Sequence, residues 1–231
     1  MSRVLVVNAD DLGHSVEVNR GVARAFDHGI VTSASLMVRR PSAEDAAALA
    51  RGRPELSVGL HIDLGEWIYR EGEWWPVGEV VSPSNRAVVE REVEAQAGRF
   101  RDLLGRDPTH LDSHQHVHRE EPARSAVLAL GVRLGVPVRH FANGITYRGE
   151  FYGRSGRGEP VEGVISSDAL IRIIRTLPDG VTEVACHPGA EGVLDPVYAA
   201  ERARELEVLC DPEVRRAVED EGVELRSFGQ I

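Results

Sequence analysis

The sequence predicts one α/β domain over residues 1–231, with a (β/α) barrel-like fold of about seven strands. Short apolar runs alternate with longer helical patterns, which is typical of a parallel sheet built from βα units. An open doubly wound sheet would carry a glycine-rich phosphate-binding turn after its first strand, but NADDLGHS (8–15) stands there. Asp or His follows five of the apolar runs, where a barrel gathers functional side chains at one rim.

The order of these runs fixes the expected elements. We expect strands near residues 3–8, 31–37, 57–62, 109–113, 137–141, 181–186 and 223–226. We expect helices near residues 15–28, 42–51, 86–104, 119–134, 167–176, 196–209 and 212–220. Ser15 and Gly29 are typical of the start and end of the first helix. Asp195-Pro196 and Asp211-Pro212 each place an N-cap before a proline at the first helical position.

Two segments break the alternation and are expected to be long loops. Residues 65–85 hold all three tryptophans together with Tyr69, and residues 142–165 are rich in glycine and aromatic residues. Loops of this length in a compact domain are commonly functional. Their aromatic rings suit the C–H face of a sugar, or else they anchor the loops or form a subunit contact. The sequence leaves both interpretations open.

Composition narrows the class of protein. The net charge of −10 disfavours a nucleic-acid partner and an anionic membrane surface, because both need a basic surface. No stretch approaches the ~18 apolar residues of a membrane span, and two aspartates interrupt the N-terminus before a signal-peptide core. Cys186 and Cys210 are expected to remain thiols. We therefore expect a cytoplasmic protein with a small-molecule partner, and a homodimer.

Two adjacent aspartates, Asp10 and Asp11, follow the first apolar run. Neighbouring carboxylates at a buried strand end repel each other, and a divalent cation would relieve that repulsion. Because the chain turns at a strand end, both side chains can approach one site. One can then bind a metal while the other accepts a proton from water. A simple turn, with Asp11 capping the segment after it, is the competing interpretation.

Histidines after the third and fourth runs strengthen the metal hypothesis. His61 lies at the end of SVGLHI, and HLDSHQHVH (110–118) contains four of the nine histidines. If strand geometry continues through this segment, five side chains share one face: His110, Asp112, His114, His116 and His118. They cannot all bind one ion, so some would hydrogen-bond the ligands or cap the next helix. Such a histidine pair with a distant His and an Asp is typical of Zn²⁺, Fe²⁺, Ni²⁺ or Mn²⁺ sites.

His187 follows the sixth run, in EVACHP (183–188). Its imidazole titrates near neutrality, so it can serve as a general acid. The neighbouring Cys186 is expected to pack within the buried strand rather than to take part in chemistry.

In this order, these motifs resemble the YdjC-like carbohydrate deacetylases, the family of chitooligosaccharide deacetylases. The matching segments span residues 4–189 and include VNADDLG (7–13), GIVTSASLMV (29–38), VGLHIDL (58–64), THLDSHQHVH (109–118) and CHPG (186–189). The combination of NADD-x-G, GLH at the end of a strand and HLDSHxHxH is far more specific for this family than any one of these motifs.

The resemblance implies a distorted TIM barrel of the polysaccharide-deacetylase type. It also implies removal of an acetyl group from an N-acetylated amino sugar or short oligosaccharide, with release of acetate. It implies Asp10 as the catalytic base, His187 as the general acid, and three ligands of a divalent metal, Mg²⁺ or Zn²⁺ or another transition metal: Asp11, His61 and His114. His116 is the alternative to His114. The chain departs from the family pattern in IDLGEW (62–67) and in its short middle and C-terminal regions, which concern the substrate pocket.

Two other functions remain open on the residues alone. His61-Ile62-Asp63 with a later histidine matches the two-His-one-carboxylate pattern of non-haem iron oxygenases, although those sites commonly lie on all-β scaffolds. A non-catalytic carbohydrate-binding or metal-storage protein would keep the histidines but leave Asp10 and His187 without a role. Six arginines could contact an anionic group on the sugar: Arg39, Arg40, Arg139, Arg148, Arg154 and Arg157.

Overall fold

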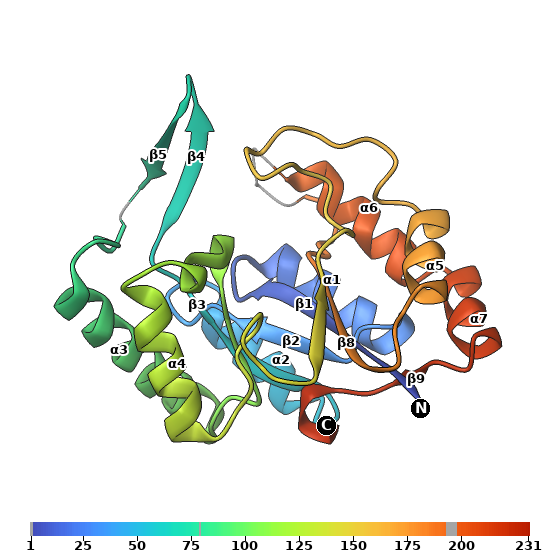
Figure 1. Cartoon of the computed structure of the whole chain (residues 1–231), viewed down its shortest axis with the longest axis horizontal. Helices are drawn as coiled ribbons and strands as arrows, with labels where there is room; N and C mark the ends of the chain where they lie inside the picture. Colours follow the sequence, from blue (N-terminus) through green and yellow to red (C-terminus); the bar gives the residue numbers. More distant parts are fainter. Residues whose placement is uncertain (1, 79, 193–197) are drawn as a thin grey trace.

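A curled parallel sheet forms the centre of the computed structural model, which describes residues 2–78, 80–192 and 198–231 (Figure 1). Its strand order is β6-β3-β2-β1-β8-β7, and the short β9 pairs with β1. The strands are β1 Arg3–Leu12, β2 Ser33–Leu36, β3 Ser57–Ile62, β6 Leu111–Ser113, β7 Ile145–Arg148, β8 Gly180–Cys186 and β9 Glu224–Leu225. The edge strands β6 and β7 do not pair within the described residues, so the sheet is an open half-barrel. This confirms the barrel-like α/β class.

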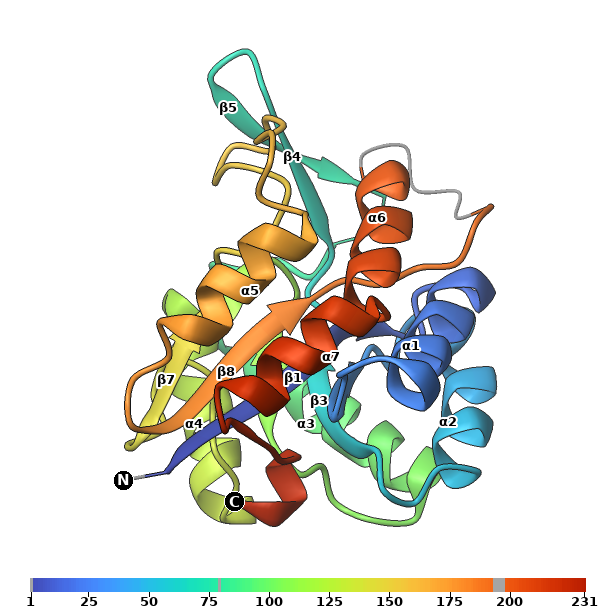
Figure 2. The same ribbon diagram turned by 90° about the vertical axis from the view of Figure 1, so that its right-hand side faces the viewer.

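Helices surround this sheet. They are α1 Val16–His28, α2 Ala43–Arg51, α3 Arg86–Leu104, α4 Ala123–Leu134, α5 Ser167–Arg175, α6 Ala199–Leu209 and α7 Pro212–Asp220. In Figure 1, α3 and α4 lie on one side of the sheet and α5, α6 and α7 on the other, while Figure 2 places α1 and α2 along the remaining flank. None of the helices in the described ranges is long and apolar enough to cross a membrane.

Local signals explain where these helices begin. The side chain of Ser15 accepts a hydrogen bond from the backbone N–H of Val18, and Gly29 ends α1, as predicted. Asp211 caps α7 through the backbone N–H of Glu213, with Pro212 at the first helical position. The predicted cap at Asp195-Pro196 lies outside the described residues.

The predicted strand at 137–141 is wrong. Val138 makes only an isolated bridge to Leu111, and the chain turns at once because the amide of Phe141 donates to the carbonyl of Val138. His140 has φ 68°, a left-handed conformation that lies outside the regular strand region. The edge position beside β8 is taken by β7 instead, within the segment 142–165 that the sequence predicted to be a loop.

Residues 65–85 are not a loop throughout. Strands β4 (Glu66–Arg70) and β5 (Glu73–Val77) form an antiparallel hairpin that projects from the end of β3, clear of the main sheet in both ribbon views (Figures 1 and 2). Glu71 and Gly72 at its turn both have positive φ, 51° and 91°, which matches the tight turn that a twisted hairpin prefers.

Candidate active site

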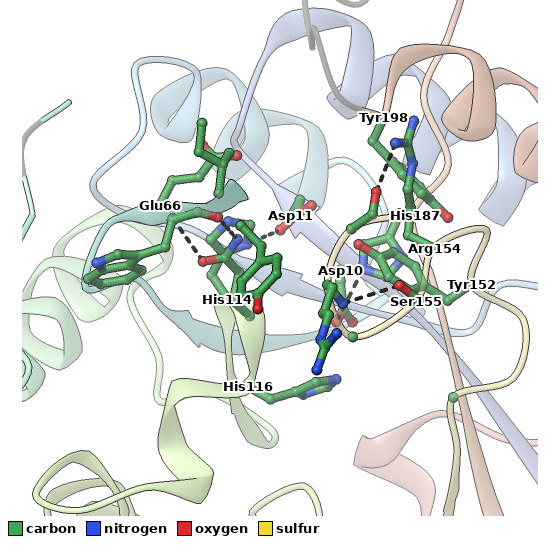
Figure 3. Close-up of a pocket in the computed structure, with 18 of the residues that line it drawn as sticks. Asp10, Asp11, Glu66, His114, His116, Tyr152, Arg154, Ser155, His187 and Tyr198 are labelled. Carbon is green, nitrogen blue, oxygen red and sulfur yellow. Dashed lines mark hydrogen bonds and ion pairs between the residues drawn. The ribbon is translucent and has the colours of Figure 1, made fainter. Parts of the chain in front are cut away.

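The carboxyl ends of the parallel strands open into a pocket of about 390 Å³. Among its lining residues are all five side chains that the sequence analysis placed in a site: Asp10, Asp11, His61, His114 and His187. Figure 3 shows four of them, Asp10, Asp11, His114 and His187, with the other labelled side chains around the pocket. The parallel arrangement therefore brings together residues that are up to 177 positions apart in the sequence, from Asp10 to His187.

Both aspartates reach the pocket because β1 is irregular at its end. The register between β1 and β2 shifts between Ala9 and Leu12, and Asp11 has φ 65°. Such a bulge re-aims side chains that would otherwise alternate between the two faces of a strand. Asp10 and Asp11 are accordingly both buried and both line the same pocket.

Asp11, His61 and His114 form a compact cluster of donor atoms, all within 4.8 Å of one another. The Oδ1 atom of Asp11 lies 3.2 Å from Nε2 of His61 and 3.1 Å from Nδ1 of His114. Neighbouring ligands of a small divalent cation with bonds of about 2.1 Å stand about 3 Å apart. One carboxylate and two imidazoles are also ligands that such cations commonly accept, so this cluster fits a divalent metal.

Surrounding polar groups hold two of these side chains in place. Nδ1 of His61 lies 2.8 Å from Oδ1 of Asp112, which leaves Nε2 turned toward Asp11. Carboxylate–histidine pairs of this kind orient metal-binding imidazoles in proteins. The Arg202 guanidinium lies 2.6 Å from Oδ2 of Asp11. Burial alone would raise the pKa of Asp11, but Arg202 and the neighbouring His114 more than reverse this, so the pKa falls well below its ordinary value.

Asp10 is held by a second buried arginine. Arg139 donates to Oδ2 and Oδ1 of Asp10 at 2.6 and 2.7 Å, and it also lies 2.9 Å from Asp112 and 2.6 Å from Glu183. Asn8 donates to Oδ1 of Asp10 at 2.8 Å. Burial raises the pKa of Asp10 and the Arg139 charge outweighs it, so the net pKa is lowered and the carboxylate is ionised at neutral pH. Asp10 is therefore an available proton acceptor.

His187 follows the end of β8 and lies between Asp10 and a carboxylate of α6. Its Nε2 atom is 3.9 Å from Oδ2 of Asp10, and its Nδ1 atom is 3.9 Å from Oε1 of Glu205 on α6. Glu205 is fully buried, and it accepts hydrogen bonds from the hydroxyl of Tyr198 and from the backbone N–H of His187. Burial lowers the pKa of His187 to about 4 and raises that of Glu205 to about 8.

The other histidines of the 110–118 segment do not join the cluster. Strand geometry ends at Ser113, and Gln115 and His116 adopt left-handed φ values of 51° and 54° within a short 3-10 segment, His114–Arg119. The expected single face of five side chains is therefore broken. His116 turns toward the rings of His140 and Tyr147, with centroids 5.1 and 5.7 Å away. Of the two candidates, His114 is the one that meets Asp11.

His110 and His118 have structural partners. The Nε2 atom of His110 lies 3.1 Å from the hydroxyl of Ser35, and its ring stacks on Phe228 at 3.9 Å. His118 contacts the Ser113 hydroxyl through Nδ1 and lies 3.1 Å from the carbonyl of Arg139 through Nε2. His118 therefore helps to position the arginine that holds Asp10.

Sequence reasoning missed two site residues, Arg202 and Glu205, and gave a third, Arg139, a different role. Arg139 was expected among the arginines that could contact the substrate, whereas it is buried and contacts the site carboxylates. Arg139 also cannot bind an anionic substrate group, because three carboxylates occupy it. Of the other arginines considered, only Arg154 and Arg157 line the pocket. Arg202 and Glu205 come from α6, where the sequence offers only their helical spacing as a signal.

The chain is similar to known proteins along nearly its whole length. The model of the YdjC-like protein family matches residues 4–220. A carbohydrate deacetylase from Geobacillus stearothermophilus is 36% identical, with 100% of this chain and 99% of the relative covered. A chitooligosaccharide deacetylase from Serratia marcescens is 31% identical, with both chains covered completely.

Two solved structures share the fold. One, from Enterococcus faecalis V583 and described as a cellobiose-phosphate cleavage protein, has a TM-score of 0.80 at 25% identity, with 100% of this chain and 99% of that chain covered. A family 4 carbohydrate esterase from Streptomyces lividans, in complex with acetate, has a TM-score of 0.55 at 10% identity, with coverage of 96% and 91%. The family match and the relatives, which the chain covers almost from end to end, show that the chain belongs to the YdjC-like protein family.

Proposed function

We propose that this protein is a metal-dependent carbohydrate N-deacetylase, which hydrolyses the acetamide of an N-acetylated amino sugar or short oligosaccharide and releases acetate. One observation carries the proposal: a single pocket places a His₂Asp donor cluster beside a buried, ionised carboxylate and an imidazole. The names of the relatives, carbohydrate deacetylase and chitooligosaccharide deacetylase, support the substrate class.

Asp11, His61 and His114 would hold the cation, for which we propose Mg²⁺ or Zn²⁺. When bound there, a divalent metal polarises the acetamide carbonyl and lowers the pKa of water. Arg202 and Asp112 would keep the carboxylate and one imidazole of this set in place, since each makes a short contact with one ligand. His116 contacts the rings of His140 and Tyr147 instead, and we do not assign it to the metal.

Asp10 would accept the proton that the attacking water gives up. Arg139 and Asn8 hold its carboxylate in a fixed orientation, and the lowered pKa keeps it ionised. His187 would deliver a proton to the departing nitrogen. With a pKa of about 4, its imidazole is neutral at pH 7, so it must first receive that proton. Asp10 lies 3.9 Å away and would supply it through one bridging water, so the proton taken from the attacking water leaves with the amine.

The two alternatives find less support. Asp63, which the oxygenase hypothesis needs as a ligand, is paired with Arg40 at 2.8 Å and accepts the backbone N–H of Gly65. The scaffold is also a parallel α/β sheet rather than an all-β fold. A pure binding protein would have no use for an ionised carboxylate beside an imidazole in the same pocket. A single domain over 1–231, a cytoplasmic location and a homodimer stay predictions of the sequence.

Metal reconstitution tests the proposal. The purified protein would be stripped of metal, supplied in turn with Mg²⁺, Zn²⁺, Mn²⁺, Co²⁺ or Ni²⁺, and assayed for acetate release from N-acetylated mono- and disaccharides. We expect metal-restored turnover, with bound metal lost in Asp11→Ala, His61→Ala and His114→Ala. The matched variant His116→Ala should keep the metal stoichiometry of the wild type. Metal bound with no acetate released from any substrate would overturn the hydrolase proposal, and metal lost only in His116→Ala would overturn the ligand assignment.

A further inference from the structure

The β4–β5 hairpin extends the active-site pocket away from the metal-binding cluster. Trp67, Tyr69 and Trp74 of the hairpin line the same pocket as Asp11 and His114. In both ribbon views the hairpin rises beyond the rim of the sheet (Figures 1 and 2). The pocket wall therefore continues onto an element that contributes nothing to the sheet or to the proposed chemistry.

The base of the hairpin is fixed beside a proposed metal ligand. The side-chain amide of Gln115 accepts from the backbone N–H of Trp67 at 3.0 Å and donates to its carbonyl at 2.8 Å. Gln115 follows His114 directly and holds a left-handed backbone with φ 51°. Because this paired contact ties Trp67 to the residue next to His114, the position of the hairpin relative to the site is defined.

An aromatic surface lies farther along the hairpin. Tyr69 and Trp74 are cross-strand partners whose rings meet edge to face at 5.4 Å. Tyr69 is two residues beyond Trp67, which is about 7 Å along an extended strand. The Arg157 guanidinium, from the segment 142–165, lies 5.4 Å from the centre of the Tyr69 ring. Trp74 is nevertheless 52% exposed, so much of its ring surface is open to a ligand.

We propose that Tyr69 and Trp74 form a binding subsite for a second sugar ring, next to the ring whose acetamide is hydrolysed. The apolar C–H face of a pyranose would pack on the Trp74 ring, and the Arg157 guanidinium could donate hydrogen bonds to ring hydroxyls at the same place. This inference rests on the proposed function for the identity of the first ring. It makes the hairpin the element that favours a disaccharide or longer substrate over a monosaccharide.

The neighbouring residue supplies a matched control. Trp75 is 53% exposed, almost the same as Trp74, but it does not line the pocket, although its cross-strand partner Ile68 does. Adjacent strand residues point to opposite faces, so Trp74→Ala and Trp75→Ala remove equal side chains from opposite sides of one strand. A general loss of hairpin structure would affect both variants alike.

The test compares kcat/KM for an N-acetylated disaccharide with kcat/KM for the matching monosaccharide. We expect Trp74→Ala to lower this ratio about tenfold, the equivalent of ~1.4 kcal/mol, while Trp75→Ala leaves the ratio at the wild-type value. Trp74→Phe, which keeps an aromatic face, should recover most of the ratio. An equal fall in both alanine variants, or no fall in Trp74→Ala, would overturn the subsite.

Calorimetric binding of the fully deacetylated disaccharide separates this proposal from the deacetylase proposal, because it needs no hydrolysis. If the wild type releases no acetate but binds this disaccharide more tightly than Trp74→Ala does, the subsite stands and the reaction is wrong. If acetate is released and neither binding nor the kcat/KM ratio depends on Trp74, the reaction stands and the subsite is wrong. If the wild type neither releases acetate nor binds the disaccharide, both are wrong.

Discussion

Removing Arg139 should be among the most damaging single changes in this protein. Its side chain is 1% exposed, and the guanidinium lies within 2.9 Å of three carboxylates, those of Asp10, Asp112 and Glu183, whose side chains are at most 4% exposed. Arg139→Met keeps most of the side-chain volume but leaves these carboxylates without their shared counter-charge. Breaking one buried ion pair in this way costs about 3–5 kcal/mol.

That cost is large against the ~5–15 kcal/mol by which domains are normally stable. Part of it is relieved, because burial raises the pKa of Glu183 to about 7 and this side chain can take up a proton when Arg139 is gone. We therefore expect the free energy of unfolding to fall by about 3–5 kcal/mol, the cost of one broken buried ion pair, rather than by that amount for each of the three carboxylates. With a urea m-value of about 2–3 kcal/mol/M, the unfolding midpoint of the metal-free protein should fall by about 1–2.5 M.

The pH dependence gives a second, independent check. In the wild type the pKa of Asp10 is lowered, so its contribution to stability is present above its unfolded value and is lost as the pH falls through the folded value. Without Arg139, burial raises that pKa above the unfolded value, so the ionised side chain destabilises the fold at pH 7 and protonation relieves this at acidic pH. The stability difference between wild type and Arg139→Met should therefore shrink between pH 7 and about pH 4.

Arg139→Lys separates charge from geometry. It restores one positive charge, but an ammonium group lacks the planar fork that meets several carboxylates at once, so we expect a partial recovery of stability. Urea unfolding followed by circular dichroism measures all three proteins. An Arg139→Met protein within about 1 kcal/mol of the wild type at pH 7, or a loss that does not change with pH, would refute the reasoning.

Three further predictions concern protons and the hairpin. The pKa of His61 is raised to about 10, because Asp112 and Asp11 more than reverse the effect of burial. Metal binding at pH 7 should therefore release about one proton per ion, which calorimetry would detect as a heat of binding that depends on the buffer. A heat of binding that is the same in all buffers would contradict this. Burial raises the pKa of Glu205 to about 8. The free energy of unfolding of the wild type should therefore fall between pH 5 and 8 relative to that of Glu205→Gln. If the two free energies changed in parallel with pH, the raised pKa of Glu205 would be wrong. Gln115→Ala should accelerate hydrogen exchange of the Trp67 backbone amide roughly tenfold, because it removes the hydrogen bond that this amide donates. An unchanged exchange rate would mean that Gln115 does not stabilise the base of the hairpin.

The sequence allowed much of the fold to be predicted because its signals are local. Apolar periodicity and caps such as Ser15 and Asp211 located the helices, and Asp10, Asp11 and His187 could be placed in one site because parallel strands share a rim. The hairpin was missed for a different reason. Strand β4 is only half-buried and β5 is exposed throughout, so the alternation that marks a buried strand is weak, and only the Glu71-Gly72 turn indicated the hairpin.

Ion pairs between residues far apart in the sequence could not be predicted from such local patterns. Arg202 meets Asp11 across 191 positions, and Arg139 meets Asp10 across 129, so no local spacing connects either pair. The selection of His114 over His116 depended on backbone conformation as well. Two consecutive left-handed residues, Gln115 and His116, redirect the chain after His114, and neither is a glycine that would have indicated the turn.

These charges explain why the site is suited to a cation. Asp10, Asp11 and Asp112 all have lowered pKa values and are ionised at neutral pH, whereas only Arg139 and Arg202 face them with permanent positive charge among the contacts of the described residues. Two arginines cannot balance these three buried carboxylates together with Glu183, which shares Arg139 and has a pKa raised to about 7. The proton that His61 retains up to a pKa of about 10 offsets part of the remaining negative charge. A divalent cation bound between Asp11 and His61 would replace that single charge with two. The proton on His61 and the metal therefore compete for one electrostatic position, and the arginines set how strongly that position attracts a cation.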